Sequence, residues 1–142
     1  MISENSRIMP ESTPSNNPEI QKYALELDFI KTSVASRKIV MFSTTYCRWC
    51  KVAAGYFKQF DMNVNKIEIN EPLKHNGQTF TEEQGRNMFG ILSQATDNQA
   101  TVPKVFVCGK YLGGCQEVQA TFESGRLEKI LDDCKKDERF AE

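Results

Sequence analysis

Two cysteines separated by two residues, Cys47 and Cys50, are the side chains of this sequence with the clearest chemical potential. They follow a short apolar segment, 39–42, and stand where the next helix is expected to begin. Cysteines at this spacing in the first turn of a helix lie on one face, close enough for a disulfide to open and close with little backbone movement. The pair therefore predicts thiol–disulfide redox chemistry.

The two cysteines are expected to have different roles. Cys47 would lie at the helix N-terminus, where backbone N–H groups, the helix dipole and the cations Arg48 and Lys51 favour the reactive thiolate. Cys50, one turn further along, would be shielded and suited to attack a mixed disulfide formed at Cys47. We predict that Cys47 is the nucleophile and Cys50 the resolving thiol.

Metal binding is the main alternative for such a pair. A structural zinc site needs four ligands, usually including a second Cys or His pair. The sequence has one histidine, His75, and its other cysteines, Cys108, Cys115 and Cys134, form no second Cys-x-x-Cys motif. No metal site is predicted. In a reducing compartment the five cysteines are expected to be mainly reduced, which favours a catalytic pair over a structural one.

Composition limits the class of protein. The chain has 142 residues, of which 39% are hydrophobic and 26% charged, with a net charge of −1. These values fit one soluble domain and give no reason to expect nucleic acid as a partner. No apolar run approaches the roughly 20 residues of a membrane span, and residues 1–19 lack the apolar core of an export signal. We expect a cytoplasmic protein that binds no membrane.

The remaining segments must position the cysteine pair. Residues 1–17 are expected to form a disordered tail, 18–135 the domain, and 136–142 a charged C-terminal tail. The strand–helix–strand order around the pair predicts two parallel strands. In chain order we predict a helix over 18–36, a strand over 39–42, a helix over 48–60, a strand over 64–69, a polar loop over 71–80, a helix over 82–96, a strand over 104–108, a turn at 109–110, a strand over 111–113, and helices over 115–123 and 127–134.

Three motifs, in this order, are similar to the signatures of dithiol glutaredoxins. They are Thr45-Tyr46-Cys47-Arg48-Trp49-Cys50, Thr101-Val102-Pro103 with the apolar strand after it, and Gly113-Gly114-Cys115-Gln116-Glu117. The similarity covers about residues 20–134. It implies a thioredoxin fold of the α/β class: a four-stranded mixed sheet flanked by helices, here with an extra N-terminal helix, and a cis peptide bond before Pro103.

The resemblance also implies a function. Such a protein is a glutathione-dependent thiol–disulfide oxidoreductase, which reduces protein disulfides and glutathione mixed disulfides. It takes part in electron transport and in cell redox homeostasis. Glutathione is a cosubstrate and no cofactor is tightly bound; the partners are disulfide-containing or glutathionylated proteins, and a monomer is expected. The residues that the resemblance assigns to glutathione are Tyr46, Arg48, Trp49, Thr101, Val102, Pro103, Gly114, Cys115, Gln116 and Glu117.

The sequence departs from the family around the cysteine pair. Arg48 and Trp49 replace the common proline and tyrosine, and Thr44 stands where a lysine is frequent. Arg48, Lys51 and Arg86 are therefore candidates to bind a carboxylate of glutathione. The missing proline also permits an alternative function: a carrier of a 2Fe–2S iron–sulfur cluster held between two subunits by Cys47 and glutathione.

The remaining cysteines have no assigned chemistry at this point. Cys115 lies in the expected glutathione site and is expected either to be packed or to be sensitive to oxidation, and Cys108 is expected to be packed. Cys134 is predicted to be a small apolar residue on the inner face of the last helix.

Overall fold

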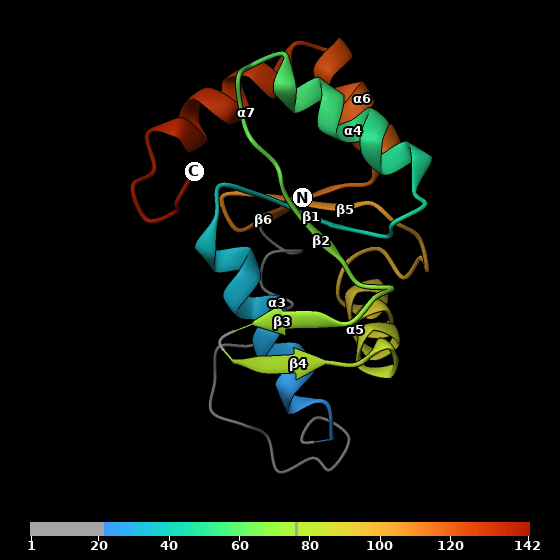
Figure 1. Cartoon of the computed structure of the whole chain (residues 1–142). Coiled ribbons are helices and arrows are strands. Elements are labelled where there is room, and N and C mark those ends of the chain that lie inside the picture. Colours follow the sequence, from blue (N-terminus) through green and yellow to red (C-terminus); the bar gives the residue numbers. More distant parts are fainter. Residues whose placement is uncertain (1–21, 76) are drawn as a thin grey trace.

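The computed structural model describes residues 22–142 except residue 76, so the tail predicted over 1–17 and the start of the predicted N-terminal helix lie outside the described residues. Along this part of the chain no helix is long and apolar enough to cross a membrane. The described elements are α3 (Ala24–Ser36), β1 (Ile39–Ser43), α4 (Arg48–Lys58), β2 (Asn65–Glu68), β3 (Leu73–His75), β4 (Gln78–Phe80), α5 (Glu82–Ala95), β5 (Lys104–Val107), β6 (Lys110–Gly113), α6 (Cys115–Glu123) and α7 (Arg126–Lys135) (Figure 1).

A four-stranded sheet forms the centre of the molecule, with strand order β2-β1-β5-β6. β1 pairs in parallel with β2, as the strand–helix–strand pattern predicted, because α4 crosses over between them. β1 also pairs antiparallel with β5, and β5 antiparallel with β6. The predicted mixed sheet flanked by helices is confirmed.

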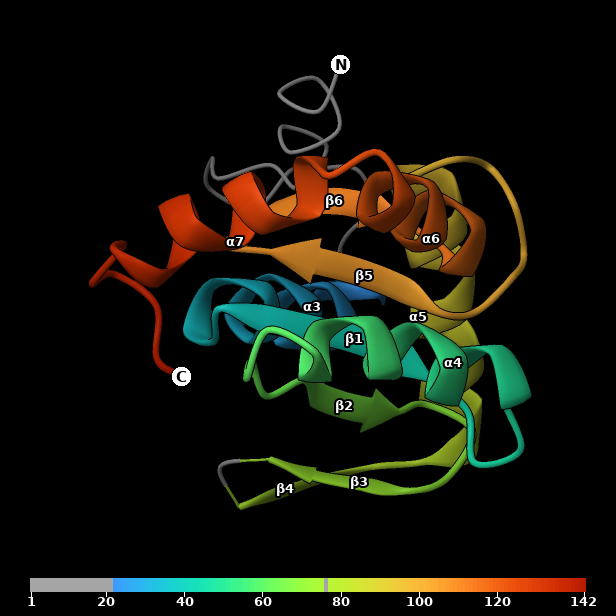
Figure 2. The same ribbon diagram turned by 90° about the horizontal axis from the view of Figure 1, so that it is seen from above.

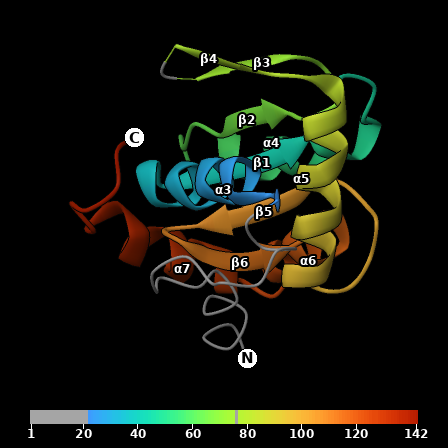
Figure 3. The ribbon, with the colours of Figure 1, turned by 90° about the horizontal axis from the view of Figure 1, so that it is seen from below.

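β1 is buried on both faces, and this places it in the middle of the fold. Val40 and Phe42 belong to the core beneath α3 and α5, whereas Ile39 and Met41 belong to the core beneath α4, α6 and α7. Figure 2 shows the sheet from the side of α4, α6 and α7, and Figure 3 from the side of α3 and α5. Because packing on both faces fixes the position of β1, it also fixes where the residues that follow this strand begin.

The prediction of a polar loop over 71–80 is wrong, because β3 and β4 form an antiparallel hairpin there. Leu73 pairs with Phe80, and Gly77, at a φ of 80°, has the backbone conformation that a tight turn needs. The rings of His75 and Phe80 lie 5.0 and 5.1 Å from the ring of Phe29 in α3. Contact with this helix stabilises two strands of three residues each, which are too short for their alternation to be recognised in sequence.

The turn between β5 and β6 lies one residue earlier than predicted. Val107 pairs with Lys110, so the turn residues are Cys108 and Gly109, with φ values of 46° and 83°. Two successive positive φ angles are typical of the hairpin turns that suit the twist of the strands. A Cβ atom at position 109 would also lie 3.2 Å from Cζ of Phe140, so this turn is in contact with the C-terminal segment.

The charged residues 136–142 fold back onto the domain. Ala141 forms a parallel bridge with Arg37 just before β1. The N–H of Lys38 donates to the carbonyl of Ala141 over 2.7 Å, and the N–H of Ala141 donates to the carbonyl of Ser36 over 3.0 Å. The end of the chain therefore extends the contacts of the central strand.

Two of the cysteine expectations need correction. Cys134 is 4% exposed on the inner side of α7, as predicted, but it is not merely a small apolar residue, since it forms a disulfide with Cys108. The expectation that the cysteines are mainly reduced does not hold in this structure, because Cys47 and Cys50 are bonded as well and only Cys115 is a free thiol.

Candidate active site

The first disulfide lies where β1 passes into α4. The Cα atoms of Cys47 and Cys50 are 5.2 Å apart. Cys47 is the N-cap residue of α4, and the backbone N–H of Cys50 donates to its sulfur over 3.1 Å. Cys50 is 1% exposed, whereas Cys47 is only half-buried. A thiol that attacks this bond, or a substrate disulfide that the reduced pair attacks, can thus reach Cys47 but not Cys50.

The short connection before Cys47 is fixed to the neighbouring strand. The N–H of Cys47 donates to the carbonyl of Thr44 over 3.2 Å. Asn70, just after β2, accepts the N–H of Thr45 at 3.0 Å and donates its side-chain amide to the hydroxyl of the same threonine at 2.9 Å. These bonds hold the cysteine pair at the carboxyl ends of two parallel strands.

A second segment of the site is the connection that enters β5. The Val102–Pro103 peptide bond is cis, as the resemblance implied, and Pro103 is buried. The next residue, Lys104, is fully buried, and its ammonium group donates to three acceptors in the preceding loop. They are Oδ1 of Asp97 at 2.7 Å, the carbonyl of Gln99 at 2.8 Å and Oγ1 of Thr101 at 3.4 Å. Lys104 therefore ties the loop to the strand.

Asp97 is the anionic centre of this network. Besides Lys104, it accepts a hydrogen bond from the hydroxyl of Tyr111 over 2.8 Å. Burial opposes its ionisation, but the hydrogen bonds from Lys104, Tyr111 and the backbone of Gln99 outweigh burial and hold the pKa of the carboxyl below 3.8. Burial and the neighbouring Asp97 both raise the pKa of Tyr111, which therefore stays protonated and able to donate.

The third segment is the connection from β6 into α6. Gly113 has a φ of 136°, and a Cβ there would collide with the side chain of Glu117. Glu117 Oε1 accepts the N–H of Gly114 over 2.8 Å, and a Cβ at Gly114 would lie 3.3 Å from the carbonyl of Pro103. Gly113 thus allows the side chain of Glu117 to pack against this connection, and Gly114 allows the connection to approach the cis-proline. Burial and the carboxylate of Glu117 raise the pKa of the Cys115 thiol.

These segments enclose a groove of about 380 Å³. Eight residues that the resemblance assigned to glutathione line it: Trp49, Thr101, Val102, Pro103, Gly114, Cys115, Gln116 and Glu117. Sequence reasoning missed Asp97, Gln99 and Gln119, which also line it. The position of Gln119, one turn after Cys115 in the same helix, could have indicated it.

Two assigned residues, Tyr46 and Arg48, lie outside the lining of this groove. The side chain of Tyr46 is 94% exposed. The guanidinium of Arg48 lies 5.2 Å from the ring centre of Trp49, a cation–π contact on the groove wall. Lys51 and Arg86, the other basic candidates, are exposed and do not line the groove.

Within residues 22–75 and 77–142, no three His, Cys, Asp or Glu side chains are grouped so as to hold a metal ion. Cys47, the cysteine that the iron–sulfur alternative requires as a ligand, is bonded to Cys50. Nothing in this geometry favours that alternative over thiol–disulfide exchange.

The fold and the accessible dithiol define the class: a thioredoxin-fold protein that carries out thiol–disulfide exchange. A family model described as glutaredoxin matches residues 39–112. Glutaredoxin-C4 of Arabidopsis thaliana is 36% identical over 106 residues, which cover 75% of this chain and 70% of the relative. Glutaredoxin-C8 of rice is 32% identical over 117 residues, covering 80% and 78%. The crystal structure of a buckwheat glutaredoxin–glutathione complex superposes with a TM-score of 0.69 at 30% identity, covering 81% of this chain and 94% of that one.

The chain belongs to the glutaredoxin family. Its Cys47–Cys50 pair is the dithiol of a glutathione-dependent thiol–disulfide oxidoreductase.

Proposed function

We propose that Cys47 is the nucleophile of this oxidoreductase, that Cys50 resolves its mixed disulfides, and that the groove beside them binds glutathione. The observation that carries the proposal is that Cys47 is half-buried while Cys50 is 1% exposed, and that Trp49, between these two cysteines, lines the same groove as Thr101-Val102-Pro103. The buckwheat relative was crystallised as a glutaredoxin–glutathione complex, which supports glutathione as the occupant.

The reaction is a series of thiol–disulfide exchanges. The Cys47 thiolate attacks a disulfide or a glutathionylated cysteine, and the leaving thiolate takes up a proton. The mixed disulfide at Cys47 is then broken by a second glutathione or by Cys50. In the latter case two glutathione molecules reduce the Cys47–Cys50 disulfide and leave as glutathione disulfide. The N–H of Cys50, 3.1 Å from the sulfur of Cys47, is in place to stabilise the thiolate at each return.

The Gly114–Glu117 turn in the groove is suited to the γ-glutamyl end of glutathione. Arg48, outside the lining, is the candidate for a carboxylate at the other end. The carboxylate of Glu117 can pair with the ammonium group, and the start of α6 offers N–H groups to an anion. Arg48 lies against Trp49, which is part of the groove wall. The substrates we propose are disulfide-containing or glutathionylated proteins. We also propose that the protein is a monomer and acts in the cytoplasm.

The first experiment compares Cys47→Ser with Cys50→Ser. Turnover of a glutathione mixed disulfide is measured with glutathione, glutathione reductase and NADPH, beside an anaerobic absorbance spectrum. Cys47→Ser should lose all exchange, because no attacking sulfur remains. Cys50→Ser should keep deglutathionylation and lose the reduction of a protein disulfide. Equal loss in both variants would contradict these roles, and visible cluster absorbance with slow turnover would replace the proposal by the iron–sulfur alternative.

A further inference from the structure

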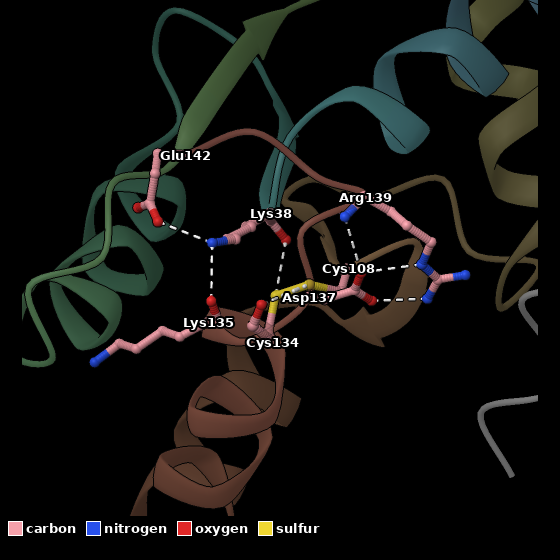
Figure 4. Close-up of a disulfide and its surroundings, with 7 residues drawn as sticks. All are labelled: Lys38, Cys108, Cys134, Lys135, Asp137, Arg139 and Glu142. Carbon is pink, nitrogen blue, oxygen red and sulfur yellow. Dashed lines mark hydrogen bonds and ion pairs between the residues drawn. A yellow bond between two sulfur atoms is a disulfide. The ribbon is translucent and has the colours of Figure 1, made fainter.

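The second disulfide, between Cys108 and Cys134, has no part in the reaction above. Cys108 is in the turn between β5 and β6, and Cys134 is in the last turn of α7, 26 positions along the chain. Their Cα atoms are 5.8 Å apart, within the range of ordinary disulfides. Figure 4 shows the bond beside Lys38 and the C-terminal residues.

This bond lies at the far end of the central strand from the active dithiol. The N–H of Cys108 donates to the carbonyl of Lys38 over 2.6 Å, and Lys38 directly precedes β1. Cys47 follows the other end of β1, which has 5 residues. At about 3.3 Å per residue, the strand alone separates the two disulfides by roughly 16 Å. Neither Cys47 nor Cys50 can exchange directly with this bond within one molecule.

Three segments of the chain meet at the second disulfide. Besides the β5–β6 turn and the end of α7, the start of β1 takes part through Lys38. Its ammonium group donates to the carbonyl of Lys135 over 3.1 Å and pairs with Glu142 over 2.9 Å (Figure 4). Its backbone N–H binds the carbonyl of Ala141. The disulfide thus adds a covalent link to a junction that hydrogen bonds, an ion pair and the buried side chains of α7 already hold.

The two sulfurs differ in access to solvent. Cys134 is 4% exposed, whereas Cys108 is half-buried in its turn. An external thiol can therefore attack at Cys108, and Cys134 must then leave as a buried thiolate. Its sulfur lies 3.8 Å from the carbonyl oxygen of Lys38, whose negative dipole disfavours that anion. Cys50 is buried as well, so the carbonyl of Lys38 beside Cys134 is the difference between the two leaving thiolates. Since exchange slows and reverses when the leaving thiolate is poor, the Cys108–Cys134 bond should resist reduction more than the Cys47–Cys50 bond.

We propose that Cys108 and Cys134 form a second redox site, which exchanges with glutathione disulfide and fastens α7 and the C-terminal segment to the sheet. In its oxidation, the Cys108 thiolate attacks glutathione disulfide and one glutathione leaves. The Cys134 thiolate then attacks the sulfur of Cys108, and the second glutathione leaves. Two protein thiols lose two electrons and two protons, and glutathione disulfide becomes two glutathione molecules. Two glutathione molecules reverse the process.

The test uses the full chain equilibrated in glutathione buffers of different reduced-to-oxidised ratio. Free thiols are alkylated and mapped by mass spectrometry, so that peptides with Cys47 and Cys50 are scored apart from those with Cys108 and Cys134. The Cys108–Cys134 pair should become half reduced at a ratio of reduced to oxidised glutathione about tenfold higher than the ratio that half reduces the Cys47–Cys50 pair. Alkylation of Cys108 and Cys134 in every buffer, or simultaneous reduction of both pairs, would overturn the proposal.

The structural effect is tested by thermal unfolding. The oxidised wild type should have a Tm about 10 °C above that of Cys108→Ala, because a disulfide across 26 positions constrains the unfolded chain. Cys115→Ala is the matched control, since Cys115 is unpaired, and should shift the Tm by less than about 3 °C. Equal Tm values for the oxidised wild type and Cys108→Ala would refute the fastening role.

The activity assay separates this proposal from the proposed function. Cys108→Ala should turn over a glutathione mixed disulfide within about twofold of the wild-type rate, because the second site lies at the other end of β1. A large loss of turnover with intact folding would show that the two sites are not independent. Loss of activity in Cys47→Ser with an unchanged response of Cys108 and Cys134 to glutathione would leave the second site standing.

Discussion

Replacing Asp97 by asparagine tests the network that holds the cis-proline loop. The substitution keeps the size of the side chain and an oxygen acceptor but removes the negative charge facing Lys104. The Lys104 side chain is 0% exposed and that of Asp97 is 32% exposed. Removing one partner of a fully buried ion pair costs about 3–5 kcal/mol, and a single hydrogen bond to a charged group contributes about 1.5–3 kcal/mol. Because Asp97 is partly solvated and the amide still accepts, we expect a loss of about 2 kcal/mol.

The pH dependence of this loss identifies its cause. The folded protein holds the pKa of Asp97 below its usual value, so the carboxylate contributes stability above the unfolded pKa of about 3.9, and the contribution disappears as the pH falls through the folded pKa. The difference in unfolding free energy between wild type and Asp97→Asn should therefore be constant near neutrality. It should shrink below about pH 4.

Urea unfolding of the oxidised proteins, followed by circular dichroism at neutral and acidic pH, measures both quantities. Asp132→Asn, an exposed change on α7, is the matched control and should alter stability by less than about 0.5 kcal/mol. A loss for Asp97→Asn as small as that of the control at neutral pH would refute the role given to the ion pair. So would a loss that persists undiminished in acid.

Two further predictions concern α5 and the groove. Gly85→Ala should destabilise the protein by more than about 2 kcal/mol, because its Cβ would collide with the backbone carbonyl of Ile69, whereas Gly90→Ala, which meets nothing within 4 Å, should stabilise by up to about 1 kcal/mol; equal effects in chemical unfolding would contradict this. Glu117→Gln keeps the acceptor for the N–H of Gly114 but loses its charge, so the KM for glutathione should rise about fivefold with kcat unchanged, as about 1 kcal/mol of ion pairing requires. An unchanged KM would exclude Glu117 as the partner of the ammonium group.

Much of this fold could be predicted because its central elements have strong local patterns. The apolar run of β1 and the capping box of Thr81 and Gln84 at the start of α5 are features of consecutive residues, and this strand and this helix begin where they were predicted. The groove followed from motifs whose residues the sheet brings together. Helix 48–60 was predicted two residues too long, since α4 ends at Lys58.

What could not be predicted depends on contacts between distant segments. Lys104 is a charged residue at the start of an apolar strand, and nothing local shows that Asp97 makes its complete burial possible. The β3–β4 hairpin needs α3 as a packing surface. The Cys108–Cys134 bond joins a turn to the end of a helix. The positions of five cysteines in the sequence do not specify which of them the fold brings together.

The single tryptophan of the chain, Trp49, lies between the two active-site cysteines and forms part of the groove wall. Tryptophan emission from this protein therefore has one source, half-exposed beside the Cys47–Cys50 bond. That emission will follow the oxidation state of the first disulfide and the filling of the groove without any attached dye. It will be blind to the second disulfide, which lies beyond the opposite end of β1. The protein thus carries its own optical reporter for one of its two cystines.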